Sequence, residues 1–190
     1  MSESQGHAPP ESHVLAAAIN LCRKKGYGGV SIEKVAADAG VDASEVWRRW
    51  PSKSALLIDA LRVEVAGDLV YPDTGDFEAD MRTQLHAISR LFSDPSISPH
   101  LARLVGEAQR GPAVAEEFRE RVYAPNRTAA RRRFAKAQQE GQLREDIDID
   151  AAIDLTFAPF WFRLLLQSGP MTDEYVEAIV DMSLRGLRPS

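Results

Sequence analysis

The chain has 190 residues and a formal net charge of −5, with 44% hydrophobic and 27% charged residues. This length fits one large domain or two small ones, and a single cysteine, Cys22, excludes an internal disulfide framework and a cysteine-built zinc site. No run of about 18 apolar residues is present, and residues 1–13 lack the basic start and apolar centre of a secretory signal. We therefore expect a cytoplasmic protein without a membrane span.

The hydrophobic spacing predicts an all-α fold of about nine helices, without strand alternation or internal repeats. Residues 1–12 are polar and contain two prolines, so we expect a disordered arm there. The first helix then carries an apolar stripe from Val14 to Cys22. Gly26 stands where a left-handed glycine commonly ends a helix.

Two short helices follow, separated by a tight turn. Ser31 is placed to cap the first of them, and Gly40 stops it after about two turns. Asp42 and Glu45 match a capping box at the start of the second helix, in which Asp42 accepts from the amide three residues on and Glu45 reaches back. Val46 lies on the inward face, and a fourth helix begins soon afterwards.

The later helices make up the larger part of the chain. A fifth helix places the apolar residues of segment 77–92 on one face, and a sixth follows near Leu101. A long seventh helix is expected over residues 112–140, with a bend near Pro125. We interpret the basic cluster of this helix, at residues 131–136, as a solvated face.

The last two helices differ in kind from the others. In residues 151–166, 12 of 16 residues are apolar. The closing helix, expected over residues 172–187, carries the apolar residues Tyr175, Val176, Ile179, Val180, Met182 and Leu187. A helix that is apolar nearly all round must be covered on every side. We expect a second subunit to supply part of that cover.

The close spacing of the two short helices predicts a helix-turn-helix, in which the second helix enters the DNA major groove. Residues 20–56 contain seven basic and four acidic side chains, so this segment is basic in an otherwise acidic chain. Val46 and Trp50 anchor the second helix. We expect its outward residues, and two residues at neighbouring helix starts, to contact DNA: Ala43, Ser44, Trp47, Arg48, Arg49, Ser31 and Lys53.

Other interpretations of the same pattern remain: a three-helix bundle without DNA binding, a dimeric helical interaction protein, and an all-α enzyme that binds a small molecule. The enzyme lacks support, because neither a G-x-x-x-x-G-K loop nor a G-x-S-x-G elbow occurs. Glu116 and Glu117 are consecutive and point apart on a helix, and His86 and His100 lack metal-ligand spacing. We predict no catalytic residues, no metal site and no cofactor.

The stretch from Val14 to Leu61 resembles the DNA-binding domain of TetR-type transcriptional regulators, with KKGYGGVSIEKVAADAGVDASEVWRRWPSKSALL at its centre. The matching features are a Gly-Tyr pair after the first helix, an Ala-Gly-Val turn, an aromatic at Trp47, and Pro-Ser-Lys followed by Ala-Leu. The segment GQLREDIDID, the apolar helix and the Ser-Gly-Pro that precedes the final helix are similar to one version of the family's effector domain.

The resemblance implies a ligand-responsive repressor that binds a palindromic double-stranded DNA operator as a homodimer. Residues 13–52 would form the DNA-binding domain and residues 53–190 the effector-binding and dimerisation domain. Trp47 stands where a phosphate-contacting tyrosine is usual, so its indole N–H takes that role. Glu45 stands where a threonine is common, and a carboxylate there repels phosphate unless it caps the helix.

The resemblance also implies a pocket for an unidentified small-molecule effector and a dimer interface on the last two helices. The residues assigned to the pocket are Met81, Leu85, Phe92, Leu104, Phe118, Phe157, Phe160 and Trp161. Core packing explains the aromatic residues of this set equally well. The residues assigned to the interface are Leu155, Phe162, Leu165, Ile179 and Met182.

Overall fold

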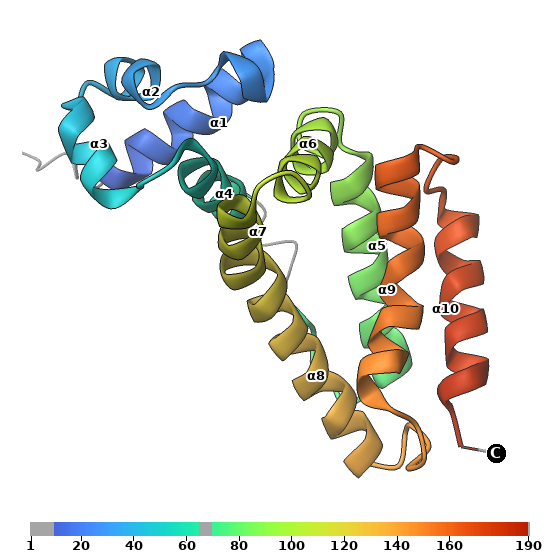
Figure 1. Cartoon of the computed structure of the whole chain (residues 1–190). Helices are drawn as coiled ribbons and strands as arrows, with labels where there is room; N and C mark the ends of the chain where they lie inside the picture. The colour runs from blue at the N-terminus through green and yellow to red at the C-terminus, as the bar shows by residue number, and fades with distance from the viewer. Residues whose placement is uncertain (1–9, 65–69, 190) are drawn as a thin grey trace, which may run out of the picture. The chain divides into compact units, whose positions relative to one another are not determined.

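The computed structural model describes residues 10–64 and 70–189, and every regular element in these ranges is helical (Figure 1). The elements are α1 (Pro10–Gly29), α2 (Ile32–Ala39), α3 (Ala43–Arg49), α4 (Lys53–Glu64), α5 (Phe77–Ser93), α6 (Ser98–Ala108), α7 (Pro112–Phe118), α8 (Ala124–Gln139), α9 (Ile149–Leu166) and α10 (Asp173–Leu187). A π-helical turn, η1 (Arg119–Tyr123), joins α7 to α8. The predicted all-α class is confirmed, and α7, η1 and α8 together correspond to the long helix expected over residues 112–140.

Two details of the first helix differ from the sequence prediction. The helix begins at Pro10, so the last part of the expected arm is helical, while residues 1–9 of that arm lie outside the described residues. Gly26 has φ 67° and ψ 172°, which is a kink and not a left-handed cap. The chain resumes helical structure after the kink and ends the element at Gly29.

The described residues pack as two compact units. The first contains α1–α4 together with Arg103–Arg121, and the second contains the described residues of 65–102 and 122–190. This grouping reflects packing alone, so the functional division at residue 52 stays a prediction. No helix in the described ranges is long and apolar enough to cross a membrane.

The core of the first unit is built where α1 packs against α2 and α4, and α2 packs against α3. The predicted stripe of α1 is buried, and so are Ile32 and Val35 of α2 and Val46 of α3. α2 and α3 have 8 and 7 residues. Isolated helices this short are marginal in water, so tertiary packing supplies most of their stability.

The second unit is organised around the apolar face of α5, against which α9 and α10 pack. Phe77 and Phe134 meet edge to face with ring centroids 4.9 Å apart, and Phe92 meets Trp161 at 4.8 Å. Polar caps fix the starts of the three helices, since Asp76, Asp148 and Thr172 accept the amide protons of Ala79, Ala151 and Tyr175.

A buried ion pair crosses the second unit and overturns part of the expected solvated face of α8. Arg133 is 3% exposed and donates to Asp80 Oδ2 from Nη2 at 2.6 Å and from Nε at 3.0 Å. Burial alone would raise the pKa of Asp80, but hydrogen bonds from Thr74 and Arg133 outweigh it and lower the pKa. Arg133 is buried because this partner lies on α5, whereas Arg131 and Arg132 are exposed as predicted.

Candidate nucleic-acid interface

The turn between α2 and α3 is set by Gly40, which has φ 69° and ψ 32°. Its N–H donates to the carbonyls of Ala36 and Ala37, and the N–H of Val41 donates to Ala36 O at 3.0 Å. These bonds satisfy the last carbonyls of α2 in the left-handed conformation that glycine adopts most easily. The sequence prediction of a tight helix-turn-helix is confirmed at this turn.

Side-chain caps fix the starts of α2 and α3. Ser31 Oγ accepts from the Lys34 amide at 3.4 Å, as predicted. Asp42 Oδ1 accepts from the Ser44 amide at 2.7 Å, so the predicted capping box is wrong in its bonding. The amide of Glu45 donates instead to the backbone carbonyl of Asp42 at 3.1 Å, which leaves it unavailable to the Asp42 carboxylate.

The helix α3 has one buried face and one exposed face. Val46 is 1% exposed and the capping residue Trp50 is 2% exposed, whereas Trp47 is 46% exposed. Of the residues predicted to face outward, Ala43 is half-buried. The others are exposed, namely Ser44, Trp47, Arg48 and Arg49. The exposed residues of α3 therefore present two guanidinium groups, a hydroxyl, an indole and the carboxylate of Glu45.

The start of α4 holds Lys53 in place. Its Nζ donates to the Tyr27 carbonyl at 3.2 Å and lies 4.2 Å from the centroid of the Tyr27 ring. Tyr27 is itself hydrogen bonded to Ser54, at 3.0 Å between the hydroxyl oxygens. A cation over an aromatic face is attracted by the ring, so the lysine is oriented before any ligand arrives. The N-cap of α4 is Ser52, whose Oγ accepts from the Ala55 amide at 2.9 Å.

Trp50 connects the end of α3 to α4. Its indole N–H donates to Asp59 Oδ2 at 3.0 Å, and Arg121 donates to the same oxygen at 2.7 Å. The buried indole therefore has a polar partner, as large aromatic anchors usually do. The sequence pattern identified the anchor but not its partner, because Asp59 lies on the following helix.

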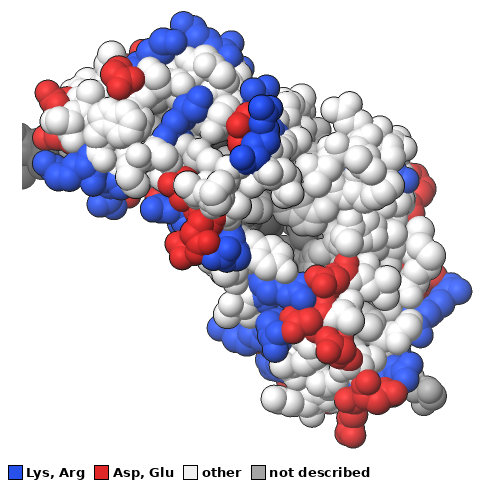
Figure 2. All heavy atoms as spheres, viewed as in Figure 1, with Lys and Arg blue, Asp and Glu red and all other residues white. Residues whose placement is uncertain are grey.

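Two carboxylates that sequence reasoning did not assign reach the exposed face of α3. Glu11 Oε2 lies 2.6 Å from Arg49 Nη2, and Glu33 Oε1 accepts from Trp47 Nε1 at 3.2 Å. Figure 2 shows acidic side chains standing beside basic ones on the surface of this unit. The indole N–H that was expected to be open for a phosphate thus has a partner within the chain.

Comparisons with known proteins agree with this geometry. Residues 14–60 match the family model described as bacterial regulatory proteins, tetR family, and residues 71–183 match the tetracyclin repressor-like C-terminal domain. The chain belongs to the TetR family of transcriptional regulators.

Individual relatives support the same assignment. The chain is 31% identical over 175 residues to the HTH-type transcriptional regulator YdeS of Bacillus subtilis (strain 168), covering 92% of this chain and 88% of the relative. It is 26% identical to the DNA-binding transcriptional repressor TetR of Mycobacteroides abscessus, covering 88% of each protein. The crystal structure of the TetR family transcription regulator SCO0332 superposes with a TM-score of 0.84 and 32% identity, covering 95% of this chain and 99% of that chain. This family consists of regulators and not of enzymes.

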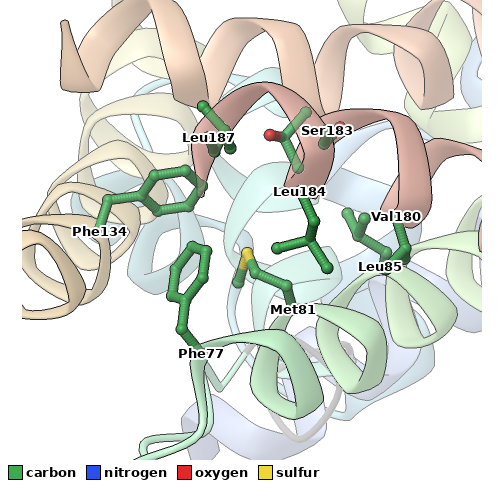
Figure 3. A pocket seen from close by; sticks show the side chains of 9 residues that line it. Phe77, Met81, Leu85, Phe134, Val180, Ser183, Leu184 and Leu187 are labelled. Carbon is green, nitrogen blue, oxygen red and sulfur yellow. The ribbon is translucent and has the colours of Figure 1, made fainter. Parts of the chain in front are cut away.

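A small cavity lies in the second unit of this TetR-family regulator (Figure 3). Its volume is about 10 Å³, and its walls come from α5, α8, α9 and α10. The lining residues are Phe77, Met81, Leu85, Phe134, Thr156, Val180, Ser183, Leu184 and Leu187. Of the residues assigned to the effector pocket, Met81 and Leu85 line this cavity, and the four lining residues from α10 were not in that set.

The other six residues assigned to the pocket lie elsewhere. Phe92 and Trp161 contact each other, Phe157 lies 6.1 Å from Tyr71 between ring centroids, and Phe160 lies 6.1 Å from Tyr175. Leu104 and Phe118 belong to the first unit. The four aromatic residues of the second unit therefore pack against other rings, as the core-packing alternative stated.

Four of the five residues assigned to the dimer interface are exposed, namely Leu155, Phe162, Leu165 and Met182. Ile179 is the exception, with 9% of its surface exposed, because it lies on the face of α10 that packs within its own chain. Leu166, at 64% exposed, is a further apolar residue of α9 that was not assigned to the interface.

The left-handed turn of the regulator predicts a specific cost for a side chain at Gly40. A Cβ there meets no atom within 4 Å, so Gly40→Ala should lose about 1–2 kcal/mol of unfolding free energy through backbone strain alone. Gly106 is the matched control, because it lies inside α6 and a Cβ also meets nothing within 4 Å. Gly106→Ala should gain about 0.5–1 kcal/mol. Denaturant unfolding at a fixed protein concentration measures the unfolding free energy of both variants. Equal losses of stability in the two variants would contradict a left-handed conformation at Gly40.

Proposed function

We propose that this TetR-family regulator is a ligand-responsive repressor that binds a palindromic operator as a homodimer. The observation that carries the proposal is the division of α3, which buries Val46 and Trp50 and exposes Ser44, Trp47, Arg48 and Arg49. An α-helix fits the major groove, and arginine can bond guanine O6 and N7 together. The named repressor among the relatives supports repression as the direction of control.

Phosphate contacts are proposed for residues that flank the recognition helix. Ser31 stands at the start of α2 and Lys53 at the start of α4, where backbone amides favour anions. Lys53 is half-buried and already held by Tyr27, so little side-chain freedom is lost when it meets a phosphate. We assign Lys53 to backbone positioning and Arg49 to base reading.

Dimerisation is proposed for the exposed apolar residues of α9 and α10. Leu155, Phe162 and Leu166 of α9 are each more than half exposed, at 60%, 56% and 64%. Their spacing of seven and four residues places them on one face of the helix. Met182 adds a fourth exposed apolar side chain from α10, which packs beside α9. A second copy of the same face would cover this surface in a two-fold arrangement.

An effector site is proposed at the cavity of the second unit. Its volume of about 10 Å³ holds roughly one water molecule, so a larger effector must separate α5 from α10 to enter. Ligand binding there would favour a different conformation, which is the requirement for coupling to DNA affinity. The walls are mainly apolar, with hydroxyls from Thr156 and Ser183.

The proposed effector also carries a hydrogen-bond acceptor. Gln84 Nε2 and Arg133 Nη1 are buried and have no hydrogen-bond partner among the described residues. Gln84 follows the wall residues Phe77 and Met81 by seven and three positions, which places it on the same side of α5. The Arg133 guanidinium lies 5.0 Å from the ring of Phe77. Each unsatisfied buried donor costs about 1–3 kcal/mol, which an acceptor on the ligand would recover.

DNA binding is tested with Arg49→Ala and Lys53→Ala on an operator selected from random duplexes and on a scrambled duplex. Arg49→Ala should cost about 1–3 kcal/mol per half-site on the operator and relax one symmetric base preference. Lys53→Ala should weaken both duplexes alike and lower the salt slope by about one per half-site. Arg90→Ala, an exposed charge on α5, is the control. Unchanged binding by both test variants would reject the DNA-binding assignment.

The dimer is tested with Phe162→Glu, which places an unpaired charge in the centre of the proposed α9 face. Sedimentation should change from twice the chain mass of 21.0 kDa to the mass of a single chain, with loss of operator binding. Val63→Glu, at an apolar residue of α4 that is 63% exposed, is the matched control and should leave the dimer intact. A wild-type protein that sediments as one chain at micromolar concentration would refute the interface.

The effector site is tested by thermal-shift screening of apolar molecules that carry a carbonyl group. Ligands that stabilise the protein should weaken operator binding, because the two sites prefer different conformations. Gln84→Met should weaken these ligands, since methionine is of similar size but carries neither the unpaired Nε2 donor nor the side-chain oxygen; unfolding of the unliganded variant is the control. Ligands that stabilise the chain yet leave operator affinity unchanged would contradict the regulatory part of the proposal.

A further inference from the structure

A carboxylate from outside the recognition helix holds one of its guanidinium groups. Glu11 lies in the first turn of α1, and its Oε2 is 2.6 Å from Nη2 of Arg49, near the end of α3. The two side chains are 46% and 58% exposed, so the pair is on the surface. Arg49 is the residue to which the proposed function assigns base reading.

A second carboxylate holds the indole of the same helix. Glu33 lies in the first turn of α2 and accepts from Trp47 Nε1 at 3.2 Å. Hydrogen bonds from its own backbone amide, from Ser31 and from Trp47 lower the pKa of Glu33, so the carboxylate is ionised at neutral pH. Trp47 and Arg49 are thus both engaged by acidic side chains of the same chain.

We propose that Glu11 and Glu33 occupy N–H donors of α3 in the place of a DNA phosphate, and that they thereby lower the affinity of α3 for every duplex. The proposal rests on the proposed function, because it requires Arg49 and Trp47 to face DNA. A carboxylate and a phosphate offer the same anionic oxygens to an N–H donor. Binding of DNA therefore exchanges one anionic partner for another, instead of adding a contact to a free donor.

The exchange affects operator and scrambled DNA in the same direction. In both complexes the Glu11–Arg49 pair must open before Arg49 contacts DNA, and the released carboxylate then lies beside the phosphate backbone. An exposed ion pair is worth about 0.2–1 kcal/mol, so opening it lowers DNA affinity by a modest factor in each half-site. Glu11 and Glu33 therefore determine how tightly the regulator binds, whereas the exposed side chains of α3 determine which sequence it prefers.

The test compares operator binding by the full chain and by Glu11→Gln, using the selected operator. Glutamine keeps the size of the side chain but removes its charge. The expected result is a two- to thirty-fold tightening, roughly the strength of one exposed pair in each half-site. The difference from wild type should shrink as the salt concentration rises, because salt screens exposed charges.

Two further variants separate a specific pair from general electrostatics. Asp38→Asn removes one exposed negative charge from α2, and it should change affinity less than Glu11→Gln does. In an Arg49→Ala background, Glu11→Gln should lose most of its effect, because the two residues interact directly. Glu33→Ala should tighten binding in a chain that retains Glu11, because it releases Trp47.

The outcomes distinguish this proposal from the proposed function. Weaker operator binding by Glu11→Gln would show that Glu11 positions Arg49 for DNA, and would refute the proposal that Glu11 competes with DNA phosphate. Equal tightening by Asp38→Asn, or tightening that survives Arg49→Ala, would overturn it too. A wild-type chain that binds no duplex would refute the proposed function instead, whatever the acidic variants do.

Discussion

The left-handed turn at Gly40 is the constraint on which the DNA-binding face depends. It ends α2 and redirects the chain within two residues, so that α3 starts at Ala43. Neither helix is long enough to be stable alone, and both depend on apolar side chains such as Ile32 and Val46 that reach one shared core. The turn and the core together decide which residues of α3 remain outside.

The second unit buries charged and polar side chains in its core. Its most buried charges, Asp80 and Arg133, satisfy each other and also use Thr74, whose hydroxyl donates to Asp80 at 2.7 Å. Apolar side chains of similar volume often stabilise a core as well as such a pair does. Unpaired nitrogens on Gln84 and Arg133 add a further cost.

Short-range signals made the DNA-binding half predictable. The cap at Ser31, the glycine turn and the apolar spacing of α2 and α3 act within one helical turn, so sequence alone located the recognition helix. The capping box failed because two amides compete for Asp42, and only geometry shows that Ser44 takes its carboxylate.

Long-range contacts were beyond the sequence pattern. Arg133 looked like part of a solvated cluster because its partner Asp80 lies on another helix. Glu11 was assigned to the arm because nothing near it in sequence indicates Arg49. Ile179 was assigned to the dimer interface but lies on the inner face of α10. Apolar residues occur on more than one side of this helix, so the sequence does not show which side packs against its own core.

The single cysteine offers a direct view of motion in the DNA-binding unit. Cys22 is 2% exposed on the inner face of α1, and burial raises the pKa of its thiol. A buried thiol reacts with alkylating reagents only when the surrounding helices open, so its modification rate reports the free energy of that opening. Because the chain contains no other cysteine, this thiol is a site-specific reporter of how firmly α1 is packed against α2 and α4.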